Sequence, residues 1–383
     1  MNSFSYNSQT AMFFGRFCVE RNADFFRKYG KRAVVFTTAF PPGHVNLGLE
    51  DMKQTLSKIG VDYLVVDHVY TDPPVEKVCE LANEIRGYGA DFFVAVGGGS
   101  AMDTAKAAAL LLKYPDDADP YEVFWGDRKP ADSIQSELSI PLFTVPTTAG
   151  TGAEATPFAV LTRSDIHTKR TMYHNAYPTA AFLDARYIIG SPKPLLHAGI
   201  FDALAHGIES SLHTGSTPMG KMLASFGFSL FKSFKDRLIS FDLTDEDYDS
   251  MMLAAFVQGL ACMQSSTTIP HGLGYPLSYD RGVSHGLACG VFLGEYLKGF
   301  KNKDVVEHIV RECGFDNSRD FADYCDLIMK DDIHIEVTYG DIETWTDNFM
   351  QTQTVRLETN PEPLAREDIE RLYRCSLRRF LKT

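Results

Sequence analysis

The sequence lacks the cysteine patterns of disulfide-rich and zinc-finger proteins. Its 383 residues include seven cysteines, and none of them forms a CxxC pair. An odd number of cysteines cannot all be paired within one chain, and unpaired thiols are typical of a reducing compartment. We therefore expect free thiols and a cytoplasmic protein.

Positive charge and long apolar runs are also scarce. Lysine and arginine number 37 against 50 aspartates and glutamates, so the formal net charge is −13. This charge disfavours nucleic acid and anionic membrane surfaces as partners. No apolar run approaches the ~20 residues of a membrane helix, and the segment MNSFSYNSQTAMFFGRF does not resemble a signal peptide. The sequence predicts a soluble, unprocessed protein.

What the sequence does contain is enough apolar material for two domains, since 44% of its residues are hydrophobic. In the first half, β-branched runs alternate with helical patterns. This alternation predicts a parallel sheet with crossover helices. Strands are expected at 32–38, 61–69, 91–96, 140–148 and 179–186, with helices at 49–60 and 75–89.

After about residue 190 the strand pattern nearly disappears. Long amphipathic stretches follow at 199–213, 247–264 and 366–381. Such stretches predict helices that pack on one another. We therefore expect an α/β domain at 1–188 and an all-helical domain at 189–383.

A glycine-rich turn, VAVGGGSAMDTAK, follows one of the expected strands. It places Gly97, Gly98 and Gly99 before a helix for which Ser100 is the expected N-cap. Missing Cβ atoms and free N–H groups at a helix N-terminus suit a pyrophosphate, although an ordinary tight turn has the same composition. The spacing is not GxGxxG, so the common dinucleotide fingerprint is absent.

A second turn, VPTTAGTGAEAT, offers the hydroxyls of Thr147, Thr148 and Thr151. Small hydroxyl residues bind ribose and phosphate, but they also dominate ordinary turns. Two such turns after strands of one domain favour a ligand site, because open parallel sheets bind ligands at the carboxyl ends of their strands.

Four residues of the helical half have the chemistry of metal ligands. Asp202 and His206 are four apart in a helical pattern, so their side chains share one face. His271 and His285 each precede a glycine, and their separation is enough to leave one helix and enter the next. One carboxylate and three imidazoles would suit iron(II) or zinc. The alternative is that each histidine is a hydrogen-bonded core or capping residue.

Other features of this half are interpreted as structural. Glu209, three positions after His206, could be a further ligand, but a solvated helix face is the favoured interpretation. The stretch 271–285 contains glycines and Pro276 and is expected to be kinked and loosened. Three more histidines are interpreted as structural or surface residues: His197, His213 and His308.

Four motifs resemble, in order and at similar separations, those of the iron-containing, or group III, alcohol dehydrogenases. They are GGGSAMDTAK at 97–106, PTTAGTGAEAT at 146–156, FDALAHGIE at 201–209, and HGLGY at 271–275 with SHG at 284–286. Weaker similarity extends over nearly the whole chain, through FFG at 13–15, AAFLDA at 180–185 and NPEPLAREDIERL at 360–372. The shared order is more specific than any single motif.

The resemblance implies a Rossmann-like dinucleotide-binding domain, an all-helical domain, a dehydroquinate synthase-like architecture and a metal in the cleft between the domains. It implies Asp202, His206, His271 and His285 as the metal ligands. Lys169 matches a lysine that contacts the cofactor, or the match shifts to Arg170. The residues implied to hold NAD or NADP are Gly97, Gly98, Gly99, Ser100, Asp103, Thr147, Thr148, Thr151 and Lys169.

Two positions depart from the family pattern. Members often carry an acidic residue after the first strand that binds the adenosine ribose, whereas VVFTTAFPPG has Thr37 and Thr38 near that place. We therefore expect NADP to be accepted, with Thr38 at the cofactor. Members often have a histidine four positions after the third ligand, and this chain has Tyr275. Tyrosine, with an ordinary pKa of about 10, is a candidate proton relay there.

We expect a metal-dependent alcohol dehydrogenase or aldehyde reductase, in which the metal polarises the substrate oxygen and NAD(P) exchanges the hydride. A non-redox lyase resembling dehydroquinate synthase would need several basic residues near the metal motifs, and 262–290 contains only Arg281. An enzyme resembling the metal-free maleylacetate reductases, or a catalytically silent binding protein, would not need all four ligands. An edge strand in the first domain predicts a homodimer.

Overall fold

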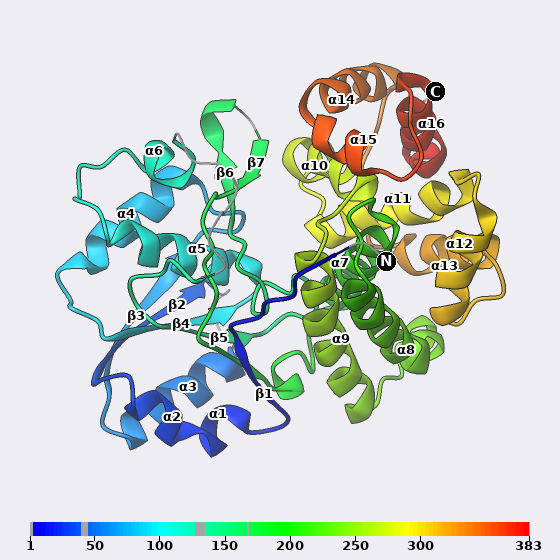
Figure 1. Ribbon diagram of the computed structural model, residues 1–383. Coiled ribbons are helices and arrows are strands. Elements are labelled where there is room, and N and C mark those ends of the chain that lie inside the picture. Colours follow the sequence, from blue (N-terminus) through cyan, green and yellow to red (C-terminus); the bar gives the residue numbers. More distant parts are fainter. Residues whose placement is uncertain (1–2, 40–44, 127–134, 167, 383) are drawn as a thin grey trace. The chain divides into compact units, whose positions relative to one another are not determined.

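The computed structural model describes residues 3–39, 45–126, 135–166 and 168–382. The chain divides into two compact units, one of Asn7–Ile189 and one of Gly190–Thr383 together with Met1–Tyr6. Every named strand of the described residues belongs to the first unit, and the second is built from helices (Figure 1). The predicted fold class, α/β followed by all-α, is confirmed.

Six parallel strands form the sheet of the α/β unit, in the order β1-β8-β5-β4-β2-β3. All five predicted strands are present. The sequence does not predict β1, because a strand of four residues at the sheet edge has little pattern of its own. A separate hairpin pairs β6 with β7. The strands are β1 Ala11–Phe14, β2 Arg32–Thr38, β3 Asp62–Val69, β4 Phe92–Gly97, β5 Leu142–Pro146, β6 Val160–Arg163, β7 Thr168–Thr171 and β8 Ala180–Leu183.

Helices cover both faces of this sheet, because successive side chains of a strand point to opposite faces. Val34 and Phe36 of β2 belong to one apolar core, with residues of α4, α5 and α6. Ala33 and Val35 belong to the other, with residues of α1, α2 and α3. These helices are α1 Cys18–Arg21, α2 Ala23–Arg27, α3 Leu47–Lys58, α4 Val75–Arg86, α5 Gly99–Leu111 and α6 Pro120–Phe124.

The connections leave β2 and β4 in opposite directions across the sheet. From β2 the chain passes through α3 to β3 at one edge, whereas from β4 it passes through α5 toward β5 and β8. The carboxyl ends of these neighbouring strands therefore flank a topological switch point, where open α/β sheets bind their ligands. Thr38 ends β2 and Gly97 ends β4.

The helical unit contains ten helices among the described residues, along with a short 3-10 helix at Arg378–Phe380. In the part of the chain that the structure covers, no helix combines the length and apolarity needed to cross a bilayer. Two further 3-10 helices, Ser164–Ile166 and Ala185–Tyr187, lie in the α/β unit. The ten helices are α7 Lys193–Leu212, α8 Pro218–Ser240, α9 Asp245–Met263, α10 Ile269–Arg281, α11 His285–Gly299, α12 Lys303–Glu312, α13 Ser318–Met329, α14 Tyr339–Thr352, α15 Thr354–Thr359 and α16 Arg366–Ser376.

Glycines bring α7, α10 and α11 into close contact. A Cβ at Gly286 would lie 1.8 Å from the carbonyl oxygen of Ala198 on α7, and one at Gly274 would lie 2.9 Å from the backbone of α11. The prediction of a loosened stretch between His271 and His285 is therefore wrong. Gly274 and Pro276 lie inside α10, and the helix ends at Gly282, whose φ is 68°.

Candidate active site

One face of α7 carries three titratable side chains. Asp202, His206 and Glu209 are spaced four and three residues apart, which puts them on the same side of the helix. All three are buried, and Glu209 is fully so. Buried charges and imidazoles need partners that compensate for their lost hydration.

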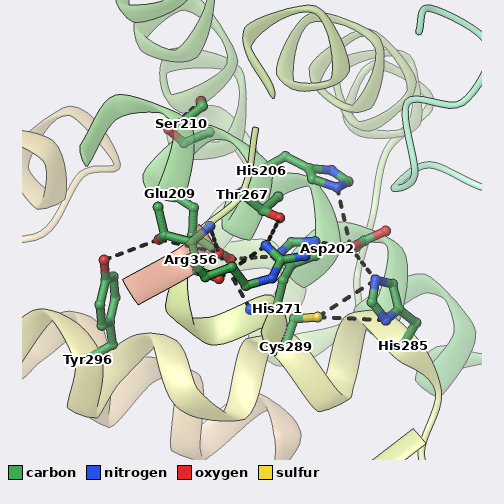
Figure 2. A network of polar contacts seen from close by, with 12 residues as sticks. Asp202, His206, Glu209, Ser210, Thr267, His271, His285, Cys289, Tyr296 and Arg356 are labelled. Atoms are coloured by element: carbon green, nitrogen blue, oxygen red, sulfur yellow. Dashed lines mark hydrogen bonds and ion pairs between the residues drawn. The ribbon is translucent and has the colours of Figure 1, made fainter. Parts of the chain in front are cut away.

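The partners come from the next helices in the helical unit. Oδ1 of Asp202 lies 3.8 Å from Nε2 of His206 on the same helix. The same oxygen lies 3.6 Å from Nε2 of His271, on α10, and 3.9 Å from Nε2 of His285, at the start of α11. Figure 2 shows Asp202 between His206 and His285. The structure therefore brings all four predicted ligands together around one carboxylate oxygen.

The chemistry of this cluster fits a divalent metal ion. Among the described residues, Oδ1 of Asp202 and Nε2 of His271 are buried without a hydrogen-bond partner. Such atoms are costly to bury, and a metal ion would satisfy both of them. A carboxylate oxygen with imidazole nitrogens is a donor set suited to iron(II) or zinc.

Cys289 is a further donor that the sequence does not predict. It follows His285 by one turn of α11, and its sulfur lies 3.8 Å from each ring nitrogen of that histidine. The donor atoms of Asp202, His271, His285 and Cys289 all lie within 4.8 Å of one another. No cysteine pattern marks this position, because the thiol reaches the cluster through helix spacing.

Glu209 does not face solvent, so the favoured interpretation of this residue is wrong. Its Oε1 lies 2.6 Å from Nδ1 of His271, and its Oε2 accepts a hydrogen bond of 2.6 Å from the backbone N–H of Thr268. An ionised carboxylate only accepts hydrogen bonds, so Nδ1 of His271 is the donor of this bond, and Nε2 is the ring nitrogen that faces Asp202. A metal ion would bind Nε2 in place of the second ring proton. Glu209 thereby fixes the tautomer and the ring orientation of a predicted ligand.

Opposite charges determine the pKa values in this cluster. Burial acts to raise the pKa of Asp202, but His206, His271 and His285 lower it below its ordinary value. Burial acts to lower the pKa of His271, but Glu209 and Asp202 raise it to about 10. The pKa of Glu209 is lowered because His271 outweighs the effect of burial. Both carboxylates are therefore anionic, so Asp202 presents a negative charge to a cation and Glu209 presents one to His271.

In the α/β unit, the two glycine- and threonine-rich turns pack against each other. β4 and β5 are neighbours in parallel register, so both turns leave the same edge of the sheet. A Cβ at Gly98 would lie 3.1 Å from Oγ1 of Thr148, and one at Gly99 would lie 3.0 Å from Cγ2 of Thr151. Gly97 accepts a hydrogen bond of 3.0 Å from the backbone N–H of Thr147. The predicted cofactor turns therefore form one continuous surface.

Ser100 does not cap α5, because the N-cap of this helix is Gly98. The Ser100 hydroxyl instead accepts a hydrogen bond of 3.0 Å from the backbone N–H of Asp72. The carboxylate of Asp72 pairs with Nζ of Lys169 at 2.8 Å. Arg170, the next residue of β7, contacts aromatic rings. Of the two candidate positions, Lys169 is therefore the one linked to the glycine turn.

Asp103 and Lys106 connect α5 to the chain that follows the threonine turn. Asp103 accepts a hydrogen bond of 3.1 Å from the backbone of Val160, and burial raises its pKa to about 6. The sequence does not mark Lys106 as unusual, because lysines on helices are ordinarily exposed. Here Lys106 is fully buried, and its Nζ donates to the carbonyl oxygens of Ala153, Thr156 and Phe158 at 2.7, 2.9 and 2.6 Å.

The end of β2 carries neutral hydroxyls. Thr37 is buried, and its Oγ1 accepts a hydrogen bond of 3.5 Å from the side chain of Asn46, the N-cap of α3. Thr38 is half-buried at the last position of the strand. The predicted segment continues into residues 40–44, which lie outside the described residues.

Tyr275 contacts both a predicted ligand and a basic residue. Its ring stacks on that of His285, with 6.1 Å between the centroids. Its hydroxyl accepts a hydrogen bond of 2.8 Å from Nη2 of Arg356, which lies 81 positions away on α15. The sequence gives no local signal for Arg356, because it lies far from the four motifs along the chain. Arg281, the basic residue within 262–290, pairs with Asp341 at 2.7 Å.

A parallel α/β unit with a ligand-binding switch point, joined to a helical unit with an Asp–His cluster, has the parts of a metal- and nucleotide-dependent oxidoreductase. Residues 9–185 match the iron-containing alcohol dehydrogenases, and residues 197–377 match the C-terminal domain of the Fe-containing alcohol dehydrogenase family. The chain belongs to the iron-containing alcohol dehydrogenase family. The resemblance seen in the four motifs is confirmed.

Relatives of this chain are alcohol dehydrogenases and aldehyde reductases. Phosphonoacetaldehyde reductase of Streptomyces viridochromogenes is 36% identical over 62% of this chain, a match that spans 60% of that relative's own length. NAD-dependent methanol dehydrogenase of Bacillus methanolicus is 26% identical over 68% of this chain and 66% of its own. Among solved structures, an iron-containing alcohol dehydrogenase of Thermotoga maritima is 29% identical in sequence and has a TM-score of 0.84. The match covers 98% of this chain and 99% of that one.

These relatives identify the chain as an oxidoreductase that acts on CH–OH donors or the corresponding aldehydes, with NAD and a metal. The family match places the chain with the dehydrogenases rather than with the non-redox lyases that the sequence left as an alternative. A metal-free reductase would not need the four predicted ligands that converge on Asp202.

Proposed function

We propose that Asp202, His206, His271 and His285 hold the metal of this enzyme, and that the turns at 97–100 and 147–151 hold the dinucleotide. The observation that carries the proposal is the approach of three Nε2 atoms to within 4 Å of one buried carboxylate oxygen. The substrate is a short-chain alcohol or aldehyde.

When bound, the metal supplies Lewis acidity toward the substrate oxygen, and the nicotinamide supplies or accepts the hydride. The chain's own residues prepare both sites. Asp202 provides the negative charge that a cation needs, and Glu209 directs the Nε2 lone pair of His271 toward it. The N-terminus of α5, with Gly98 as its N-cap, presents backbone N–H groups to a phosphate.

The proton relay predicted for Tyr275 lacks a partner to which it could pass a proton. Among the described residues the Tyr275 hydroxyl has one contact, Nη2 of Arg356. Arginine is always protonated and cannot accept a proton. A relay through Tyr275 would therefore have to pass its proton to water or to a bound ligand.

We further propose iron(II) as the metal, in keeping with the family, and acceptance of NADP alongside NAD. The neutral hydroxyls of Thr37 and Thr38 support the second point, because no described carboxylate at the end of β2 would repel a 2′-phosphate. The polypeptide is proposed to form a homodimer, supported by the edge strand β1 with its exposed Met12 and Phe14.

Metal analysis of anaerobically purified protein, followed by assays with short aldehydes and both cofactors, tests the function. We expect about one metal per chain, and NADPH turnover at least equal to that with NADH.

His271→Ala and His285→Ala should remove metal-dependent activity from a folded protein, whereas His308→Ala, at an exposed position, should not. Full activity of the double variant after metal removal would overturn the proposal. Preference for NADH by ~100-fold would show that Thr38 is misassigned. A monomer in light scattering would exclude the dimer.

A further inference from the structure

Arg356, in the helical unit, is a half-buried cation that no carboxylate of the described residues contacts. Its Nε donates to Oε1 of Gln353 at 3.0 Å, and its Nη2 donates to the hydroxyl of Tyr275 at 2.8 Å. Its Nη1 donates to the hydroxyl of Thr267 and, at 3.2 Å, to the carbonyl of Thr268. Every one of these acceptors is uncharged.

Glu209, the carboxylate whose pKa Arg356 affects, already has hydrogen-bond partners of its own. Arg356 helps to lower the pKa of Glu209, but burial and the contact with His271 have larger effects on that pKa. Oε1 of Glu209 lies 2.6 Å from Nδ1 of His271, and Oε2 accepts from Thr268. The positive charge of Arg356 is therefore left without an ion-pair partner among the described residues.

This cation lies close to the predicted metal ligands. The guanidinium carbon of Arg356 is 5.5 Å from the centroid of the Tyr275 ring, and that ring stacks on His285. A Cβ at Gly272, the residue after His271, would lie 3.0 Å from Cδ of Arg356. Because Gly272 has no side chain, Arg356 can pack against α10 next to the predicted ligand His271. Figure 2 shows Arg356 beside Thr267 and His271.

We propose that Arg356 and Tyr275 form a subsite for an oxyanion group of the substrate. The substrate would then be a short-chain aldehyde or alcohol whose far end carries a carboxylate, sulfonate or phosphonate. This inference rests on the proposed function and specifies the substrate class of the same site.

The donors that remain suit such a group. Arginine has five N–H donors, and four hydrogen bonds occupy four of them here, leaving one on Nη2. The Tyr275 hydroxyl accepts from Arg356, so its own proton is available for donation. Two donors and a permanent charge in a partly buried place bind an oxyanion more strongly than an exposed arginine would.

A purely structural role is the competing explanation. The contacts with Thr267, Thr268 and Tyr275 also attach α15 to α10 and to the segment before it. An arginine that serves only as an attachment would make activity independent of the charge of the substrate. The charge dependence of kcat/KM therefore separates the two roles.

The experiment compares 4-oxobutanoate with butanal, which share a chain length and differ by a carboxylate, as substrates of the metal-loaded protein. We expect kcat/KM to favour 4-oxobutanoate by about tenfold or more, since hydrogen bonds to charged groups have this magnitude. Arg356→Gln should lower this ratio by about 10–100-fold, chiefly through KM. Arg356→Lys should retain part of it, and Tyr275→Phe should lower it by less.

Arg366→Gln is the matched control, because Arg366 lies in the same unit and pairs with Asp347 and Glu370 at 2.8 and 3.0 Å. It should leave the ratio unchanged. Methylphosphonate supplies a readout without turnover: it should raise the melting temperature of the parent protein and leave that of Arg356→Gln unchanged. If Arg356→Gln does not fold, Arg356→Lys and Tyr275→Phe provide the same comparison.

An unchanged ratio in the Arg356 and Tyr275 variants, or a preference for butanal in the parent protein, would overturn the subsite and leave the dehydrogenase intact. Equal stabilisation of the parent and of Arg356→Gln by methylphosphonate would also overturn it. Failure of the metal-loaded protein to reduce any short aldehyde with either cofactor would instead overturn the proposed function, and the subsite with it.

Discussion

The two candidate sites are built in opposite ways. In the α/β unit, the turns depend on side chains that are missing: a Cβ at Gly98 or Gly99 would lie 3.1 or 3.0 Å from a threonine of the other turn. In the helical unit, the cluster depends on side chains that are present, with imidazoles approaching Asp202 from three positions. One site is formed mainly by the backbone at strand ends, and the other by helix faces that pack in register.

This difference has a consequence for mutation. A site formed by backbone is damaged when a side chain is added to a glycine or when a turn is displaced. A site formed by side chains is damaged when a ligand side chain is removed, or when a residue that holds a ligand in its orientation is removed. Damage to either site should therefore leave ligand binding at the other intact. Three substitutions test this separation, and a fourth tests the burial of a carboxyl group in the threonine-rich turn.

Asp202→Asn has the largest expected effect. It preserves shape but removes the negative charge that the three imidazoles approach, so we expect metal content to fall to about zero while NADH binding in fluorescence titrations persists. Asp332→Asn is the matched control, because Asp332 lies 2.6 Å from the buried His197 in a pair that includes no predicted ligand. A full metal complement in Asp202→Asn would contradict the assignment.

Lys106→Met should produce the converse result. Three backbone carbonyls lose their donor, so we expect the free energy of unfolding to fall by roughly 1–3 kcal/mol and NADH affinity to weaken, with metal content unchanged. Lys113→Met is the control, because the exposed Lys113 donates to a single carbonyl, that of Glu137. Loss of metal from Lys106→Met would show that the sites are coupled.

Glu209→Gln tests whether the carboxylate that contacts His271 contributes to metal binding. Without the carboxylate, Nδ1 of His271 loses its anionic acceptor, and metal affinity in a chelator competition should fall by about 10–100-fold. Glu137→Gln removes a comparable carboxylate, 3.0 Å from Nδ1 of His174 in the α/β unit, and should not change metal affinity. Equal metal affinity in Glu209→Gln and the parent would remove Glu209 from the site.

The smallest expected effect is on pH dependence. Burial raises the pKa of Glu154 from 4.5 to about 7. Between these values the folded chain binds more protons than the unfolded one, so this group makes stability fall as pH rises through the window. Glu154→Gln cannot ionise and should flatten the slope of melting temperature against pH, whereas Glu343→Gln, at an exposed carboxyl, should not. An unaltered slope in Glu154→Gln would contradict the burial argument.

The sequence predicted most of the fold because the central strands are buried on both faces. RAVVFTT and FFVAV are nearly continuous apolar runs, and they correspond to β2 and β4. β1 and the hairpin of β6 and β7 were not predicted, because these strands are short and mostly exposed or half-buried and so have no apolar run. β8 has the same length but is buried throughout, and the sequence predicts it. The glycines of 271–285 were misinterpreted because a bend and a tight helix contact select the same residue.

The sequence also indicated the four candidate ligands, whose residue types and helical spacing carry a chemical signal. The residues that support these ligands carry a weaker signal or none. Glu209 differs from a solvated glutamate through its contacts with His271 and Thr268, and Lys106 differs from an exposed lysine through three carbonyls of another segment. The spacing of Glu209 after Asp202 and His206 was the available clue, because it puts all three on one helix face. Arg356 offered no local clue.

The hydrogen bonds of Glu209 also bear on when the metal enters. These hydrogen bonds join protein groups alone, so they orient His271, one of the four predicted ligands, within the folded chain. Zinc fingers, by contrast, fold only with their metal. A chelator should therefore strip this protein reversibly, leaving a folded polypeptide that can be recharged.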